Sequence, residues 1–104
     1  MMQKTKKELT PKKIMTTLDM NRSDLKKYGV KKIGLFGSYI KGKQHKTSDL
    51  DFLVDLKNYT FDDYIELKFF LEKLFHKKVD LVIEKDLKPS LQYVKGEALY
   101  AKEI

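Results

Sequence analysis

The residues best suited to chemistry lie between residues 37 and 51. Gly37 and Ser38 combine a glycine, which lets a ligand approach the backbone closely, with a hydroxyl group that can bind phosphate. Ten residues separate Ser38 from Asp49, and Asp51 follows at the i+2 position. On a strand, this spacing points both carboxylates to one side of the sheet. Their repulsion reaches about 4 kcal/mol at about 4 Å for an effective dielectric constant of roughly 20, and a divalent cation would relieve it.

A third carboxylate falls on a later predicted strand. Asp80 interrupts the apolar run from Val79 to Val82, where a charge is unfavourable unless that face of the strand has a function. Magnesium prefers a few carboxylates together with phosphate and water oxygens, so these residues predict a site for Mg²⁺ and a nucleotide. The alternative is structural: an ordinary turn at residues 37–38, a turn or solvent position for Asp49 and Asp51, and a lysine partner for Asp80.

The overall charge fits an anionic ligand but does not identify one. The chain of 104 residues contains 22 Lys and Arg residues against 15 Asp and Glu residues, a net charge of +7. Such a surface attracts nucleic acids or nucleoside triphosphates, although a lysine-rich surface can also serve only for solubility. Arg22 is the only arginine, whereas recognition of guanine edges and two-bonded phosphate clamps usually favours arginine. Nucleic acid is therefore not the substrate we expect.

Composition also limits the class of protein. The chain has no cysteine and two histidines, His45 and His76, which excludes disulfides and thiolate zinc sites and argues against a histidine-rich metal centre. Its length fits one domain over residues 1–104, with a flexible tail at 1–8. It has no run of 18 apolar residues, and its lysine-rich amino end lacks the apolar stretch of a signal peptide. We expect a soluble, cytoplasmic protein.

The remaining pattern predicts helices around a mixed sheet. Thr10 and Pro11 favour a helix start, and the apolar spacing up to Gly29 predicts one helix or a broken helix pair. A further helix should begin after Thr60, with acidic residues early and basic residues late. The other predicted elements are strands at 30–36, 49–56 and 78–83, a turn at 87–90, a final helix from Leu91 and a terminal strand at 98–101. The predicted fold class is α/β (α+β), a mixed sheet covered by helices.

Together, these motifs resemble the minimal nucleotidyltransferases of the DNA polymerase beta superfamily. The resemblance rests on Gly37-Ser38, the ten-residue interval, Asp49-x-Asp51 and the later Asp80. It implies the nucleotidyltransferase-like fold and transfer of a nucleoside monophosphate from a nucleoside triphosphate, with Mg²⁺ as cofactor and release of pyrophosphate. The site residues that it implies are catalytic and metal-binding Asp49, Asp51 and Asp80, and nucleotide-binding Gly37, Ser38, Lys41 and Ser48.

The chain departs from the family pattern next to the predicted phosphate loop. The family commonly has Ala-Arg-Gly where this chain has Ile40-Lys41-Gly42. Lys41 can still neutralise phosphate, but it lacks the guanidinium fork, and Ile40 makes the turn bulkier. Tyr39, beside Ser38, could contact the nucleotide or support the loop. His45 fits a solvated loop position, and His76 fits the end of a helix.

The resemblance also implies an acceptor. Free-standing domains of this size resemble antitoxins that inactivate HEPN-family RNase toxins by adding AMP from ATP to a toxin tyrosine. We therefore expect ATP as substrate, an HEPN-family toxin as partner, and a homo-oligomer or a hetero-oligomer. Two alternatives stay open: nucleotidylation of a small molecule, as in the similar aminoglycoside-modifying enzymes, and a non-catalytic module that blocks a toxin or binds RNA.

Overall fold

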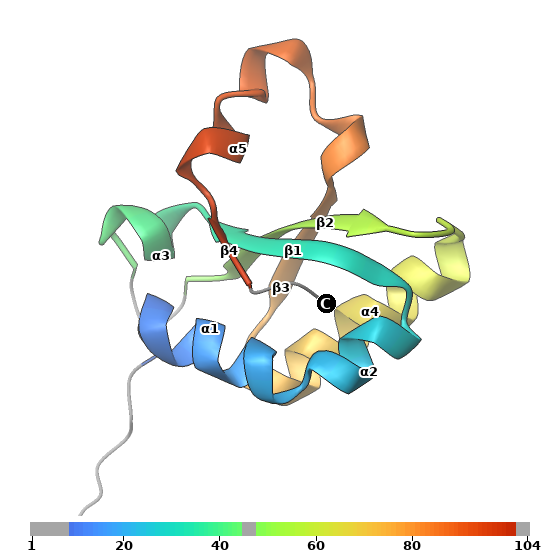
Figure 1. Ribbon diagram of the computed structural model, residues 1–104. Coiled ribbons are helices and arrows are strands. Elements are labelled where there is room, and N and C mark those ends of the chain that lie inside the picture. The colour runs from blue at the N-terminus through green and yellow to red at the C-terminus, as the bar shows by residue number, and fades with distance from the viewer. Residues whose placement is uncertain (1–8, 45–47, 102–104) are drawn as a thin grey trace, which may run out of the picture.

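The computed structural model describes residues 9–44 and 48–101 (Figure 1). Its helices are α1 (Pro11–Met20), α2 (Arg22–Lys27), α3 (Ser38–Lys41), α4 (Phe61–Phe75) and α5 (Val94–Glu97), with 3-10 turns η1 (Glu84–Asp86) and η2 (Pro89–Leu91). Its strands are β1 (Val30–Phe36), β2 (Leu50–Leu56), β3 (Val79–Ile83) and β4 (Leu99–Tyr100). The predicted tail at 1–8 and His45 lie outside the described residues. No helix within those ranges is long and apolar enough to cross a membrane.

The strands found in residues 9–44 and 48–101 form one mixed sheet in the order β3-β2-β1-β4. β1 pairs antiparallel with β2 and with β4, whereas β2 and β3 are parallel. A parallel pair needs a crossover connection, which α4 supplies between β2 and β3. The predicted mixed sheet covered by helices is thus confirmed, and the strands that carry Asp51 and Asp80 are neighbours.

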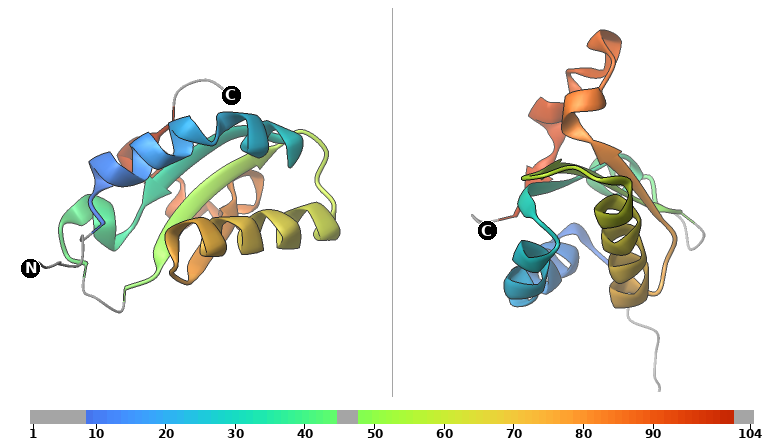
Figure 2. Two further views of the ribbon diagram at one scale, coloured as in Figure 1. Left: turned by 90° about the horizontal axis from the view of Figure 1, so that it is seen from below. Right: turned by 90° about the vertical axis from the view of Figure 1, so that its right-hand side faces the viewer.

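The core lies between the sheet and the helices α1, α2 and α4, which all cover the same face (Figure 2). Alternate residues of β2 point into this layer, so Leu50, Phe52 and Val54 are buried. Leu53 points to the opposite face and is also buried, and η1 contacts β2. The intervening Asp51 and Asp55 are only half-buried. This alternation leaves the second face of the sheet for polar chemistry.

The first predicted helix is the broken pair α1 and α2. Thr10 caps α1, since its hydroxyl oxygen accepts a hydrogen bond from the backbone N–H of Lys13 at 3.2 Å. The break comes at Asn21, whose side-chain amide donates to the carbonyl oxygen of Thr17 at 2.8 Å. A polar side chain that binds its own backbone in this way competes with continued helix. The two short helices can therefore bend around β1 and bury Ile14, Leu18 and Leu25.

The long helix α4 does more than cover the sheet, because it also seals the outer edge of β3. Its own start is capped by the Thr60 hydroxyl, which accepts from the Asp63 N–H at 3.1 Å. The backbone N–H of Val79 donates to the Glu72 carboxylate at 3.0 Å. The Tyr64 hydroxyl donates to the carbonyl oxygen of Leu81 at 2.6 Å. Side chains thus occupy backbone groups that a further strand would otherwise use.

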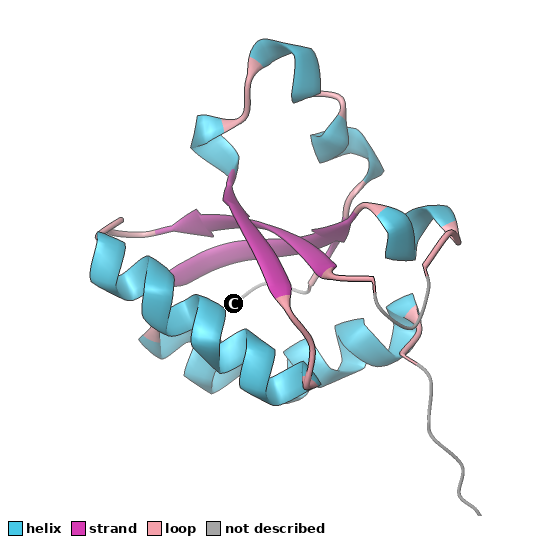
Figure 3. Cartoon of the chain, turned by 180° about the vertical axis from the view of Figure 1, so that it is seen from behind, coloured by secondary structure: helices cyan, strands magenta, loops and turns pink. Residues whose placement is uncertain are grey.

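After β3, residues 84–98 leave the sheet and return as β4, and we call this segment the C-terminal excursion. It stands on the face opposite α1, α2 and α4 (Figure 3). The predicted terminal strand is present as β4, but the predicted helix from Leu91 is wrong in length and start. Only the four-residue α5 forms, from Val94. Gly96 lies inside it, and glycine has low helix propensity.

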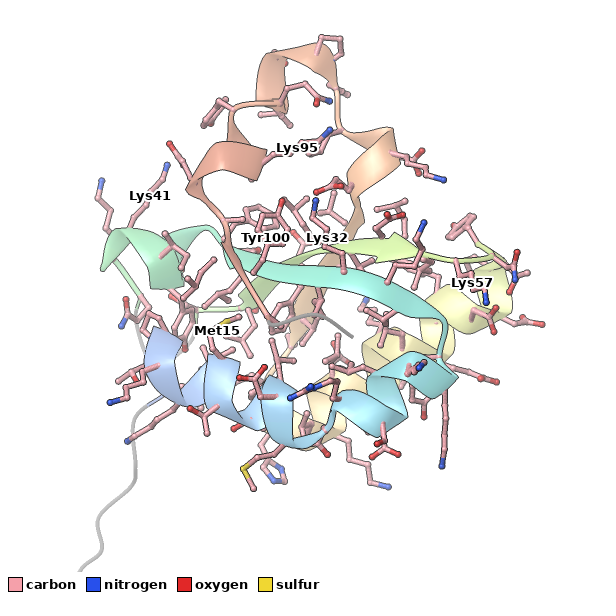
Figure 4. The ribbon with its side chains drawn as sticks, in the orientation of Figure 1. Met15, Lys32, Lys41, Lys57, Lys95 and Tyr100 are labelled. Atoms are coloured by element: carbon pink, nitrogen blue, oxygen red, sulfur yellow. The ribbon has the colours of Figure 1, made fainter. Side chains whose placement is uncertain are left out.

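Tyr100 fastens the end of the excursion to its beginning. Its hydroxyl donates to the Glu84 carboxylate at 2.9 Å. Lys32 lies beside both groups (Figure 4), with its Nζ atom 3.6 Å from the same carboxylate and 4.6 Å from the centre of the Tyr100 ring. Burial and the bond to Glu84 raise the pKa of Tyr100 to about 12, so this hydroxyl keeps its proton at neutral pH.

We predict that Gly34→Ala destabilises the protein by about 1–3 kcal/mol, because overpacking has that cost. Gly34 pairs with Tyr100, and a Cβ atom on Gly34 would lie 2.7 Å from the Tyr100 ring. Urea denaturation measures the change. Gly96→Ala is the matched control, since a Cβ atom there meets nothing within 4 Å. Equal stability of wild type and Gly34→Ala would contradict this packing.

Candidate active site

Asp51 and Asp80 lie directly opposite each other on neighbouring strands. They are register partners in the parallel β2–β3 pair, and both point to the second face because each lies one residue from a core position of its strand. Burial raises the pKa of Asp51 to about 6, with further contributions from the charges of Asp80 and Asp49 and from a hydrogen bond shared with the Asp80 side chain. The fold therefore holds two carboxyl groups that resist being charged together.

Gly37 and Ser38 follow β1 at the same end of the sheet, because Phe36 pairs with Asp51. The backbone N–H of Ser38 hydrogen-bonds to the Asp51 carboxylate and lowers its pKa, against the larger effect of burial. Gly37 has φ 81° and ψ −148°, a conformation that favours glycine. A Cβ atom on Gly37 would lie 2.9 Å from the Asp51 Cγ atom. Glycine is therefore required here twice, by its backbone and by the close carboxylate.

Asp49 and Lys41 are close to this group in the sequence. Asp49 is exposed and immediately precedes β2, and its charge acts on Asp51. Lys41 ends the short helix α3, where its Nζ atom lies 3.9 Å from Glu97 of α5. Both side chains of this ion pair are about half exposed, so it is worth roughly 0–1 kcal/mol. A phosphate group can therefore replace Glu97 as the partner of Lys41 at little cost.

Three other residues singled out from the sequence have structural roles in the described chain. The carbonyl oxygen of Ser48 accepts from the Lys77 Nζ atom at 3.3 Å, which ties the start of β2 to the end of α4. Tyr39 is buried in the core, so its side chain anchors the loop at Gly37 and Ser38. His76 caps α4 with a left-handed φ of 55°, as its expected place at a helix end suggested.

The carboxylates fit magnesium as a pair completed by substrate, rather than as a finished cage. Among the residues that the structure describes, no three His, Cys, Asp or Glu side chains converge as a metal-binding group. Asp51 and Asp80 nevertheless supply two hard oxygen donors side by side. Magnesium is commonly held by one or two carboxylates plus phosphate and water oxygens. The donor set therefore suits a magnesium–nucleotide complex better than a free metal ion.

Two features of this site were not predictable from local sequence. Asp80 was predicted as a site residue, but not the register between β2 and β3 that sets it directly opposite Asp51, with 28 residues between them in the chain. Glu97, the partner of Lys41, lies in a segment without any motif. The loop at Gly37 and Ser38 could be predicted from the sequence, because a glycine followed by a serine comes directly after an apolar strand.

We predict that Gly37→Ala abolishes magnesium-dependent nucleotide binding, because the new Cβ atom displaces the Asp51 carboxylate. Isothermal titration calorimetry with Mg²⁺ and ATP measures this loss. Gly42→Ala is the matched control: Gly42 also has a positive φ, 72°, but a Cβ atom there meets nothing within 4 Å. That control should cost about 1 kcal/mol of stability and keep its affinity. Equal affinities of Gly37→Ala and wild type would refute the assignment.

The raised pKa of Asp51 predicts a pH-dependent stability in EDTA. Because this pKa rises from 3.8 unfolded to about 6 folded, the folded state holds the proton more tightly. The associated stability is complete below pH 3.8 and is lost as the pH rises through about 6. Asp51→Asn removes this charge, so its free energy of unfolding at pH 7 should be about 1 kcal/mol higher than that of wild type. The figure is this small because Asp51 is half exposed and solvent screens its charge. Urea denaturation at pH 4 and 7, with Asp55→Asn as control, tests the sign.

Comparison with known proteins places the chain in a family. Residues 18–104 match the nucleotidyltransferase domain family. The chain is 38% identical over 85 residues to the protein adenylyltransferase MntA of Thermococcus cleftensis, covering 80% of this chain and 86% of that protein. It is 48% identical over 64 residues to a Methanocaldococcus jannaschii protein provisionally named a protein adenylyltransferase, covering 59% of this chain and 64% of that protein.

Solved structures agree with this assignment. A minimal nucleotidyltransferase superposes with a TM-score of 0.76 at 30% identity, covering 90% of this chain and 98% of that one. A toxin–antitoxin complex with AMP-PNP superposes with a TM-score of 0.59 at 30% identity, covering 83% of this chain and 66% of that one. The family match begins within α1 and includes β1 to β4. It therefore contains both strands that carry the carboxylate pair. The chain therefore belongs to the nucleotidyltransferase domain family.

Proposed function

We propose that this protein is an antitoxin that transfers AMP from ATP to a tyrosine of an HEPN-family RNase toxin in a Mg²⁺-dependent reaction. The observation that carries the proposal is the in-register pair Asp51 and Asp80, set beside the glycine-containing loop at Gly37 and Ser38. The names of the relatives support a protein acceptor, and the toxin–antitoxin complex with AMP-PNP supports a toxin partner and an adenine nucleotide. The proposed location is the cytoplasm, where ATP is available as substrate.

The aspartates have distinct parts in this proposal. Asp51 and Asp80 would hold the metal as a pair, with Asp49 proposed as a further ligand, and bound Mg²⁺ would neutralise charge on the phosphates. Asp80 is the exposed member of the in-register pair, so it orients the acceptor hydroxyl and receives its proton. The acceptor oxygen forms a bond to the α-phosphorus while the bond to pyrophosphate breaks. In a solved structure of MntA and HpeT, two aspartates were changed to glutamate. Those two aspartates are two positions apart, as are Asp49 and Asp51.

The loop residues bind and orient the triphosphate. Gly37 leaves room for the Asp51 carboxylate because it has no side chain, and the Ser38 N–H holds Asp51 in place. Both residues are assigned to the triphosphate site. When the nucleotide binds, Lys41 leaves Glu97 and pairs with phosphate oxygens. Ser48 is proposed as a further nucleotide-binding residue. The Asp51 pKa of about 6 leaves this carboxyl largely ionised at pH 7, which metal binding requires.

A protein acceptor suits the described surface better than a small molecule does. A cavity of about 380 Å³ lies between α1 and β4, lined by Met15, Leu99 and Tyr100 among others. None of the proposed catalytic or nucleotide-binding residues lines it. A small acceptor needs a walled pocket beside the reacting group, whereas a docked protein brings its own hydroxyl and covers an open site. This cavity therefore gives no support to a small acceptor, and the names of the relatives favour the antitoxin proposal over aminoglycoside modification.

The decisive test combines the protein, ATP, Mg²⁺ and the co-encoded HEPN-family protein. We predict mass increases on that protein in steps of one AMP, with a loss of at least ~100-fold in rate for Asp80→Asn, since a group that acts in general acid–base catalysis contributes that much. ATP affinity should fall much less than the rate in this variant, because Asp80 acts mainly in the transition state. Intact-mass measurement and calorimetry provide the two readouts.

Three results would count against the proposal. Unmodified HEPN-family protein that is nevertheless inhibited would favour the non-catalytic module. Labelling of an aminoglycoside alone would favour the small-molecule enzyme. Full activity of Asp80→Asn would remove that residue from the mechanism, whichever acceptor is labelled.

A further inference from the structure

The segment from Asp49 to Glu72 has the opposite charge to the rest of the protein. It contains seven acidic and two basic residues, a net charge of −5 in a chain whose net charge is +7. The segment comprises β2 and most of α4, so its charge is concentrated on one part of the fold. Bound metal can neutralise part of the charge at Asp49 and Asp51. Asp62 and Glu66 lie exposed on α4, outside the proposed metal site.

One flank of α4 runs along the outer edge of β3. Phe61, Ile65, Lys68 and Glu72 follow each other at spacings of four and three residues, which places them on one side of the helix. Glu72 binds the Val79 N–H on that edge. Phe61 and Ile65, at the start of the same flank, therefore lie towards the end of β3 at Ile83.

Large aromatic side chains are exposed at the start of this flank. Phe61 is 67% exposed and Tyr59 is 53% exposed. Tyr59 lies edge-on to Tyr64, with ring centres 6.3 Å apart, and Tyr64 bonds to Leu81 next to Asp80. The charge of Asp80 contributes to raising the pKa of Tyr64, after burial as the main cause. Tyr64 thus connects the exposed Tyr59 to the backbone of β3, one residue from Asp80.

The sealed edge of β3 limits how a partner can bind here. Glu72 and Tyr64 already occupy backbone groups of Val79 and Leu81, so a partner cannot add a strand at those positions. Contact must be made by side chains. Exposed aromatic residues with charged residues at their border are typical of such an interface.

We propose that Tyr59, Phe61 and Ile65, with Asp62 and Glu66 at their border, form the surface on which the protein acceptor docks. The acceptor that fits has an apolar centre bordered by Lys or Arg side chains, because opposite charges guide and orient association. Asp80 lies near the start of β3, so the acceptor docked at the start of α4 reaches it by extending the segment that carries its hydroxyl along the edge of that strand. This inference rests on the proposed function and identifies which surface of the toxin-binding protein is used.

The test compares a protein acceptor with a small one. The co-encoded HEPN-family protein and N-acetyl-tyrosinamide are each incubated with ATP and Mg²⁺, and AMP transfer is followed by mass. The variant is Tyr59→Ser/Phe61→Ser, and the matched control is Met20→Ser, since Met20 is 80% exposed on α1. The double variant should raise the KM for the protein at least ~10-fold, the effect of removing interface anchors, with unchanged transfer to N-acetyl-tyrosinamide. The control should match wild type on both.

Charge gives a second readout. Asp62→Lys/Glu66→Lys should weaken binding of the HEPN-family protein and flatten the dependence of its affinity on salt, because both carboxylates face basic groups in the complex. Stronger binding of this variant would show that the partner is not basic at that border and would overturn the proposal. ATP affinity serves as the check that each variant is folded.

The failure of this inference can be told from failure of the proposed function. If wild type labels neither acceptor, the proposed function is wrong, and calorimetric binding of the HEPN-family protein then decides the docking surface alone. Equal KM or equal affinity of the protein for wild type and Tyr59→Ser/Phe61→Ser overturns the inference. So does an equal loss on both acceptors, or an equal loss in Met20→Ser.

Discussion

The central physical constraint in this protein is the repulsion between two carboxylates that the sheet forces together. Asp51 and Asp80 are partners across a parallel strand pair, so neither can move away without breaking the ladder. Burial adds to the difficulty of charging Asp51. The protein tolerates this cost because the opposite face of the same strands carries a continuous apolar core. An isolated strand pair could not maintain such an arrangement.

The other parts of the site follow from this constraint. A carboxylate that is hard to charge needs donors, and the Ser38 N–H supplies one directly after β1. The donor can reach Asp51 only if the chain turns closely over it, and Gly37 permits that turn. The helices α1, α2 and α4 lie on the other face (Figure 2), which keeps the carboxylates accessible to ligands. Stability and accessibility are thus assigned to opposite faces of one thin sheet.

The sequence was most informative where local chemistry decides the structure. The caps at Thr10 and Thr60, the strands and the Asp49-x-Asp51 spacing all depend on neighbours in the chain, and these elements formed close to their predicted ranges. The broken helix at Asn21 was one of two forms expected. The predicted helix from Leu91 was wrong because Gly96 and the turns around Pro89 leave little room for regular helix. Contacts such as Lys41 with Glu97 depend on tertiary packing and leave no local pattern.

The bond between Glu84 and Tyr100 joins the two ends of the C-terminal excursion, and this has a consequence for how such proteins can diverge. A segment pinned at its base can change in length at a cost of only about 0.6 kcal/mol for each doubling. Its sequence is also nearly independent of the core, since Val94 is its only buried hydrophobic residue within the described ranges. Insertions or replacements between residues 84 and 98 should therefore spare the carboxylate pair. Evolution can vary this segment while the sheet stays unchanged.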